Sequence, residues 1–487
     1  MRVIFIFITI ISIALKISAQ NNSINKKDLI IYDFIKSYNY RDYKKMKRNL
    51  FFIGKVVVSK NKMKETFTEI YDVWGKFTVK KISHLSETKT EVRVVSQRDT
   101  TETEMFNFFF NKKNKLTGFF IKKADFYYPL NKKATSNGLL TNEKSRKIDS
   151  LISKKGREGN FNGSVLVIDS GNAIYKNNYG YSNFEKKAIL NDSSVFYLAS
   201  CSKQFTAMAI MILAEKGKLK YSDTIQKFIP DFPYKNITIE NLLTHTSGLP
   251  DYMTLMGKYW DKQKQANNYD VVNTLFKIKP AVYFKPGENF DYSNTGYVIL
   301  GIIIEKSSGV SFNEFMTKNI FNPIGMNHTF VGGSSKEAGD KLPNWAYGYV
   351  YSNSLKEYVI PEKLNWYQFV TYLDPIFGDG NINSTITDLA KWEKSLRENV
   401  LVTKTTLNIS YTKYKLKNGE ITEYGYGECI SDKMGMERVV YHSGGWQGYR
   451  SFILRLVNKD LSIVVLSNNE YVSFNQLVDE IALILLN

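Results

Sequence analysis

The stretch Ser200-Cys201-Ser202-Lys203 decides how this chain is interpreted, because it places a hydroxyl and an amine three positions apart. An apolar run at residues 205–214 follows it without proline or glycine, which predicts a buried helix that ends near Gly217. Side chains three positions apart share one face of a helix. We therefore expect Ser200 and Lys203 to lie within hydrogen-bonding distance. A buried lysine that loses its proton easily would make this serine a nucleophile.

Ser-x-x-Lys spacing also occurs at ordinary helix starts with an exposed lysine, so a catalytic interpretation needs support from other segments. One is Tyr292-Ser293-Asn294, predicted in a loop between the turn at Pro286-Gly287 and an apolar helix at residues 297–304. Another is His442-Ser443-Gly444-Gly445, after a predicted strand at residues 438–441. A third is the polar loop at residues 244–250, in which a histidine is expected to hold the loop by hydrogen bonding. Their order along the chain is more informative than any one of them.

In these motifs and their order, the chain from about Lys147 onward resembles the serine β-lactamase and penicillin-recognising superfamily. It is most similar to the class C-like branch, which includes DD-peptidases, D-aminopeptidases and esterases. The resemblance implies an α/β catalytic domain at residues 140–487, with an antiparallel sheet flanked by helices and a mainly helical lobe. It also implies a site in the cleft between these parts, with Ser200 at a helix N-terminus and His442 on an edge strand.

The resemblance assigns roles to the motif residues. Ser200 would be the acylated nucleophile, and Lys203 its proton acceptor or electrostatic activator. Tyr292 would move protons between the nucleophile, the leaving group and water, while Asn294 would hold Lys203 and the substrate amide. The oxyanion hole would use backbone N–H groups of Ser200 and Gly445. The third motif would supply the substrate-binding and oxyanion positions, here His442, Ser443, Gly444 and Gly445.

The third motif departs from the family's usual Lys-Thr/Ser-Gly, because His442 stands where lysine is common. Lysine keeps a permanent cation near a substrate carboxylate, whereas histidine titrates near neutrality. We therefore expect amides and esters to be better substrates than β-lactams. Activity is also expected to fall on the acid side as His442 becomes protonated, at its ordinary pKa of about 6.5.

The sequence thus predicts a serine hydrolase that cleaves an amide or ester bond through an acyl-enzyme on Ser200. The expected substrate is a D-amino-acid peptide, such as one derived from the cell wall, or a small ester. Two alternatives stay open: a true β-lactamase, and a non-catalytic penicillin-binding sensor that is acylated without turnover. The four histidines are scattered, and Cys-x-x-Cys and Gly-x-Ser-x-Gly do not occur. No metal, cofactor or nucleic acid is therefore expected.

Residues 1–19 have the pattern of a secretory signal peptide. A basic start is followed by an apolar run at residues 3–15, too short to span a bilayer comfortably, and by small residues at Ser18-Ala19. This predicts export to the periplasm or beyond, with an uncleaved membrane anchor as the alternative. Cys201 and Cys429 are expected to be free rather than bridged.

Residues 20–135 are predicted to form a separate small α+β domain. A helical pattern at residues 27–50 precedes four predicted strands, at residues 77–85, 91–97, 104–111 and 116–122. This order resembles the nuclear-transport-factor-2-like fold, and residues 131–143 are predicted to be a linker. Residues 21–140 hold 25 Lys and Arg against 12 Asp and Glu, in a chain of net charge +19. The excess favours contact with an anionic surface, with the lysine-rich composition of the whole chain as the alternative explanation.

Overall fold

The chain divides into two compact units, residues 1–126 and 127–487. The computed structural model describes residues 25–41, 76–84, 86–87, 89–96, 103–110, 116–123, 139–159, 161–352, 355, 357–364, 367–432, 438–470 and 474–486. The predicted signal peptide, and the predicted linker up to residue 138, lie outside these ranges. Within these ranges no helix combines the length and apolar character needed to cross a bilayer.

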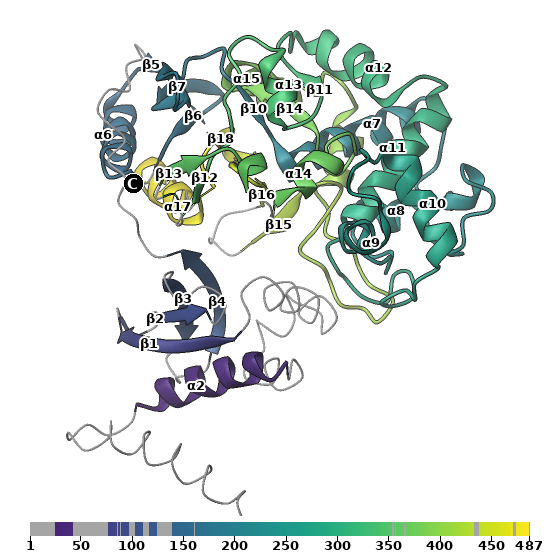
Figure 1. Ribbon diagram of the computed structural model, residues 1–487. Coiled ribbons are helices and arrows are strands. Elements are labelled where there is room, and N and C mark those ends of the chain that lie inside the picture. Colours follow the sequence, from purple (N-terminus) through teal and green to yellow (C-terminus); the bar gives the residue numbers. More distant parts are fainter. Residues whose placement is uncertain are drawn as a thin grey trace, which may run out of the picture. The chain divides into compact units, whose positions relative to one another are not determined.

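In its described residues, the N-terminal unit packs α2 (Lys26–Asn39) against a four-stranded antiparallel sheet (Figure 1). The strands follow chain order across the sheet: β1 (Phe77–His84), β2 (Lys89–Ser96), β3 (Thr103–Phe110) and β4 (Leu116–Lys123). The ring of Phe34 meets Phe108 edge-on with 5.5 Å between centroids, and Tyr38 stacks on Phe77 at 5.0 Å. Aromatic burial therefore joins the helix to the sheet. The likeness to the nuclear-transport-factor-2-like fold stays a prediction.

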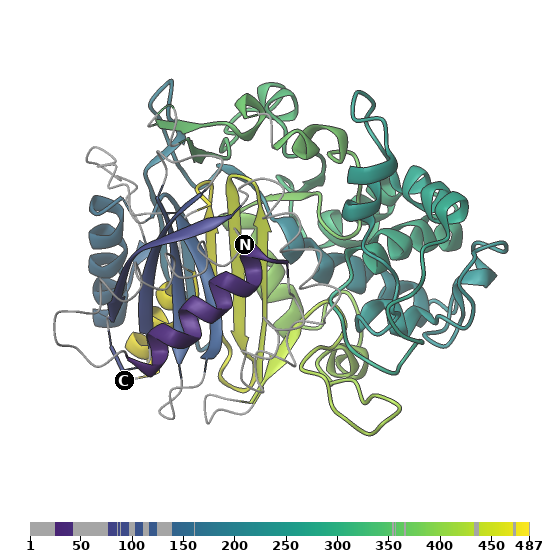
Figure 2. The same cartoon turned by 60° about the horizontal axis from the view of Figure 1, so that its bottom comes forward.

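A seven-stranded antiparallel sheet forms the centre of the second unit, in the order β15-β16-β17-β18-β6-β7-β5 (Figure 2). Strands from the start and the end of this unit pair directly, because β18 lies beside β6. The strands are β5 (Leu139–Leu140), β6 (Gly163–Asp169), β7 (Asn172–Tyr179), β15 (Cys429–Ser431), β16 (Val439–Trp446), β17 (Tyr449–Leu456) and β18 (Leu461–Ser467).

Helices cover both faces of this sheet. Successive side chains of a strand point to opposite faces, so each face buries its own set of apolar residues. In β6, Val165 belongs to one apolar cluster and Leu166 to another. The first cluster includes side chains from α6 (Glu143–Arg157) and α17 (Phe474–Leu486). The second includes side chains from α7 (Lys203–Glu215) and α15 (Ile386–Arg397).

The middle of the chain builds a mainly helical lobe around α7 and α11, both of which are largely buried. Its helices are α8 (Ile239–Leu243), α9 (Tyr252–Tyr259), α10 (Asn268–Ile278), α11 (Asn294–Ser308), α12 (Phe312–Met316), α13 (Lys336–Asp340), α14 (Phe369–Tyr372) and α16 (Lys404–Ser410). Short strands complete the unit: β8 (Tyr181–Asn183), β9 (Ala188–Ile189), β10 (Val195–Tyr197), β11 (Phe330–Val331), β12 (Val350–Ser352), β13 (Glu357–Val359) and β14 (Ile382–Thr385).

Four details differ from the sequence-based expectations. The helix predicted at residues 27–50 ends at Asn39, and the end of the linker predicted at residues 131–143 instead forms β5 and the start of α6. Asn294 is the first residue of α11 rather than a loop residue, because the Ser293 side chain caps the helix by accepting the Gly296 N–H at 3.2 Å. Strand β16 is also not an edge strand along its whole length, because β15 pairs with it as far as Tyr441. Of the described strands, only β17 pairs with β16 from His442 onward.

Candidate active site

Ser200 lies in a short 3-10 turn, η1 (Ala199–Ser202), that leads directly into α7. The Nζ of Lys203 donates to Ser200 Oγ at 3.3 Å, to Asn294 Oδ1 at 2.9 Å and to the carbonyl oxygen of Asp379 at 2.6 Å. An ammonium has three N–H groups, so these three acceptors fix its position. The structure therefore brings Ser200, Lys203 and Asn294 together, although Asn294 lies 91 residues from Lys203 in the sequence.

The turn before Ser200 has an unusual backbone. Ala199 has φ of +48°, which is rare for a residue other than glycine and is often held by the surrounding structure at functional sites. Here the Oγ of Ser451 donates to the carbonyl of Leu198 at 2.6 Å. The backbone of Gly444 also lies against this turn. A Cβ added at Gly444 would lie 2.3 Å from the carbonyl oxygen of Leu198. The third motif and Ser200 are therefore neighbours.

Burial decides the charge state of Lys203. The side chain is fully buried, which lowers its pKa to about 8 even though the nearby Asp379 carboxylate favours the charged form. Burial also raises the pKa of Asp379, whose carboxylate accepts a hydrogen bond from the Tyr252 hydroxyl at 3.1 Å. A lysine with this pKa has a substantial neutral fraction near pH 8, so it can take a proton from Ser200.

The hydroxyl of Tyr292 is buried and makes no hydrogen bond of good geometry with any described residue. Lys203 Nζ lies 5.0 Å from the centre of its ring. Burial raises the pKa of Tyr292 well above its usual value, while the neighbouring Ser200 side chain acts in the opposite direction. A neutral phenol beside the nucleophile is suited to exchange a proton with a bound substrate.

The ring of His245 packs against the ring of Tyr292. Its Nδ1 accepts the Ser293 N–H at 3.0 Å, so the neutral ring carries its proton on Nε2. Its ring centroid lies 4.2 Å from that of Tyr292. Burial holds the pKa of His245 well below its usual range. The contacts are those of the structural role expected for this histidine.

A family model for β-lactamases matches residues 148–486, more than half of the chain. The chain belongs to the β-lactamase family. Penicillin-binding protein 4* of Bacillus subtilis (strain 168) is 40% identical over 327 residues, 67% of this chain and 72% of its own. The octameric penicillin-binding protein homologue of Pyrococcus abyssi is 31% identical, covers 67% of this chain and 74% of its own, and superposes with a TM-score of 0.57.

A D-amino acid amidase from Ochrobactrum anthropi SV3, complexed with L-phenylalanine amide, shares the fold. It is 23% identical, covers 71% of this chain and 99% of its own, and has a TM-score of 0.60. The predicted superfamily and fold class are therefore confirmed. The placement in the class C-like branch stays a prediction.

Three further residues of the site, Asp379, Tyr252 and Tyr424, could not be identified from a sequence motif. Asp379 lies outside the motifs from which the site was predicted. Tyr252 and Tyr424 are two of 32 tyrosines. Both cysteines are free thiols, and Cys201 Sγ donates to the His442 carbonyl at 3.3 Å. In the described part of the chain, no cluster of three or more His, Cys, Asp or Glu side chains is arranged to hold a metal ion.

His442 is only 3% exposed and is held by two hydrogen bonds. Its Nδ1 lies 2.7 Å from the carbonyl oxygen of Ser443 and therefore donates, so Nε2 accepts from the Tyr424 hydroxyl at 2.9 Å. Burial and the nearby Lys203 lower its pKa to about 3. The expected titration of His442 near pH 6.5 is therefore wrong, because the folded protein keeps this ring out of water and next to a cation.

We accordingly expect His442 to stay neutral from pH 5 to 8 and to contribute no acid-side loss of activity in that range. The pH profile of kcat/KM with a neutral ester should have the same shape in wild type and in His442→Asn, although the absolute rate will fall if Tyr424 shifts. Initial rates across this range test the expectation. An acid limb in wild type that disappears in His442→Asn would contradict it.

Proposed function

We propose that this protein is a serine hydrolase that cleaves an amide or ester bond through an acyl-enzyme on Ser200. One observation carries the proposal: Ser200 Oγ lies 3.3 Å from the Nζ of a fully buried lysine whose pKa is lowered to about 8. Neutral Lys203 can remove the hydroxyl proton while Oγ attacks the substrate carbonyl carbon. Asn294 keeps the amine oriented toward Ser200.

The tetrahedral intermediate places negative charge on the former carbonyl oxygen. Backbone N–H groups near Ser200 and Gly445 are the proposed donors to this oxygen. Collapse of the intermediate breaks the bond to the leaving amine or alcohol, which receives a proton through the Tyr292 hydroxyl. Water then attacks the acyl carbon, the same groups take its proton, and Ser200 Oγ is released with its hydrogen restored.

The proposed substrate is a D-amino-acid peptide or a small acyl ester. A relative that is 40% identical is named a penicillin-binding protein, which supports a carbonyl substrate that can acylate this serine. The signal-like residues 1–19 support export, so a cell-wall peptide would be within reach. The basic composition of residues 21–140 supports contact with an anionic surface, as a further part of the proposal.

The third motif favours neutral substrates over β-lactams. His442 is uncharged and faces Tyr424, so it supplies no cation for a substrate carboxylate. Arg450 pairs across the hairpin with Gly445, but its Nη1 donates to the carbonyl oxygens of Trp446 at 3.2 Å and Tyr449 at 3.0 Å. These hydrogen bonds leave Arg450 charged but hold its guanidinium at the turn after Gly445, so position 442 itself carries no cation.

We expect kcat/KM for an activated ester or a D-amino-acid amide to exceed that for a chromogenic cephalosporin by at least about tenfold. Losing one hydrogen bond between the substrate and a charged group is expected to lower kcat/KM by roughly tenfold. Initial rates with a panel of esters, D-Ala-D-Ala peptides and the cephalosporin test this, with Ser200→Ala measuring the background. Faster turnover of the cephalosporin would support a true β-lactamase instead. One equivalent of product followed by a persistent label would support a sensor.

A further inference from the structure

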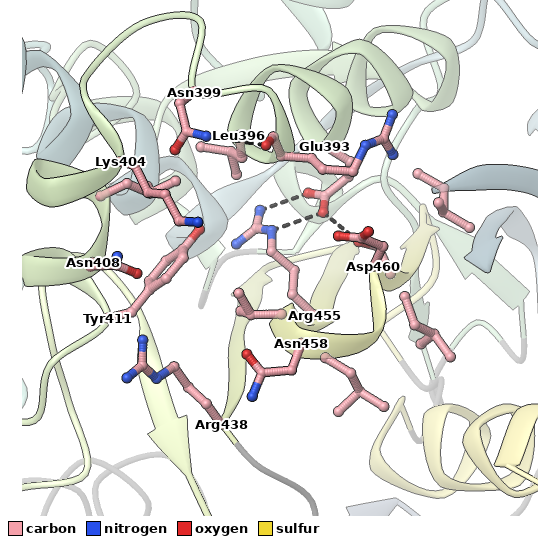
Figure 3. A pocket seen from close by; sticks show the side chains of 17 residues that line it. Glu393, Leu396, Asn399, Lys404, Asn408, Tyr411, Arg438, Arg455, Asn458 and Asp460 are labelled. Atoms are coloured by element: carbon pink, nitrogen blue, oxygen red, sulfur yellow. Dashed lines mark hydrogen bonds and ion pairs between the residues drawn. The ribbon is translucent and has the colours of Figure 1, made fainter. Parts of the chain in front are cut away.

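A pocket with a volume of about 270 Å³ lies between α15, α16 and the turn that joins β17 to β18 (Figure 3). Neither Ser200 nor any other residue of the candidate active site lines it. Part of its surface is apolar, formed by Leu396, Leu407 and Leu461 among others. The rest is formed by charged and amide side chains, so the pocket has the mixed character of small-molecule sites.

One wall of the pocket is a buried ion-pair network. Arg455 donates from Nε to Glu393 at 2.8 Å and from Nη1 to Glu428 at 2.6 Å, and Ser462 donates to Glu393 at 2.7 Å. Arg455 is 4% exposed and Glu393 also 4%. One guanidinium is shared between two carboxylates, and burial raises the pKa of Glu428, whose second oxygen has no described partner, to about 7. The network is held by its own hydrogen bonds, so it forms a fixed wall rather than free ligand contacts.

Three other polar groups of the lining lack partners. Lys404 and Arg438 are exposed and make no hydrogen bond or ion pair with any residue that the structure describes. Lys404 reaches the pocket from α16, and Arg438 from the position just before β16. Tyr411 is 5% exposed; its hydroxyl has no hydrogen-bond partner among the described residues and is accessible from the pocket. Figure 3 shows these three side chains along one side of the pocket, and Asp460 across from them.

The Tyr411 hydroxyl opens onto the pocket and is available to donate a hydrogen bond, and the exposed cations Lys404 and Arg438 create a positive local field beside it. Burial also raises the pKa of Tyr411, so its hydroxyl keeps its proton and can donate a hydrogen bond. An anionic oxygen between these groups would satisfy all of them. The leucine side chains nearby would cover an apolar body attached to that anion.

We propose that this pocket binds a small organic anion, a carboxylate or phosphate group on a short apolar body. Lys404 and Arg438 supply the charge, and Tyr411 donates a hydrogen bond. The site is separate from the proposed acyl transfer and does not depend on it. It is nevertheless connected to the catalytic helix, because Arg455 Nη2 donates at 2.5 Å to Gln204, the residue that follows Lys203.

Titration calorimetry on the full chain tests this with four probes: hexanoate, hexyl phosphate, 1-hexanol and inorganic phosphate. We expect saturable one-to-one binding of at least one of the first two, tighter than either 1-hexanol or inorganic phosphate. The headgroup that binds more tightly identifies the natural ligand as a carboxylate or a phosphate. Equal affinity for 1-hexanol, or no saturable binding of either anion, would overturn the proposal.

Variants locate the binding. Lys404→Gln with Arg438→Gln should weaken the tighter anion by at least about tenfold, the scale of losing charged hydrogen bonds. Tyr411→Phe keeps the ring and should weaken it by a smaller factor. Lys262→Gln with Lys277→Gln removes the same charge from exposed positions outside the pocket and should leave the affinity unchanged. Equal weakening in this control would show that the anion binds only through the general positive charge.

Discussion

Replacing Ser200 by alanine is expected to lower kcat/KM for esters and amides by at least about 10⁴-fold, the scale of removing a nucleophile. It should also abolish covalent labelling by a fluorophosphonate or a penicillin. The physical reason is that the Lys203 amine would have no hydroxyl to activate. The fold should survive, because the Ser200 side chain makes its one hydrogen bond of good geometry with Lys203. Steady-state rates and mass mapping of the labelled peptide measure both effects.

Ser202 provides the control for this experiment. It lies two residues away, but its Oγ is buried and accepts the backbone N–H of Ile382 at 3.1 Å. Ser202→Ala should therefore cost about 1–3 kcal/mol of unfolding free energy, because that N–H loses its partner. The folded variant should still be labelled on Ser200. A label on Ser202 or Ser443 in the wild-type protein would contradict the assignment of the nucleophile.

Replacing Lys203 by methionine is expected to slow acylation by at least about 10²-fold, the usual scale of a lost general base. Methionine fills a similar volume without the amine. In wild type, the acylation rate should rise with pH through about 8, because the pKa of Lys203 is lowered by burial and only the neutral amine accepts a proton. The variant should lack this rise. Stopped-flow acylation from pH 6 to 10 measures both rate and profile.

Lys216 gives a matched control at the other end of the same helix. It is exposed, and its Nζ donates to Asn319 at 2.9 Å outside the candidate site. Lys216→Met should keep the wild-type rate and the wild-type pH profile. If Lys203→Met retained the rise near pH 8, another group would be the base, and Lys203 would only orient Asn294 and the carbonyl of Asp379.

Much of the fold follows from local patterns. Residues 163–169 and 172–179 form a hairpin whose turn contains Ser170 and Gly171, both with positive φ. The run after Lys203 forms the predicted buried helix. The helix predicted from residue 297 begins three residues earlier, at Asn294. The apolar pattern starts only at Tyr297, but the Ser293 side chain caps the helix before it.

The sequence by itself predicted the pairing of Ser200 with Lys203, because a spacing of three residues places both side chains on one face of a helical turn. It also determined the family, through motifs in a fixed order. Only the tertiary structure decided the charge states: His442 is neutral and Lys203 has a lowered pKa. It likewise brought Asp379 to Lys203 from 176 residues away. Burial and the charges that gather around a group set its pKa, and both depend on contacts between segments that no local pattern records.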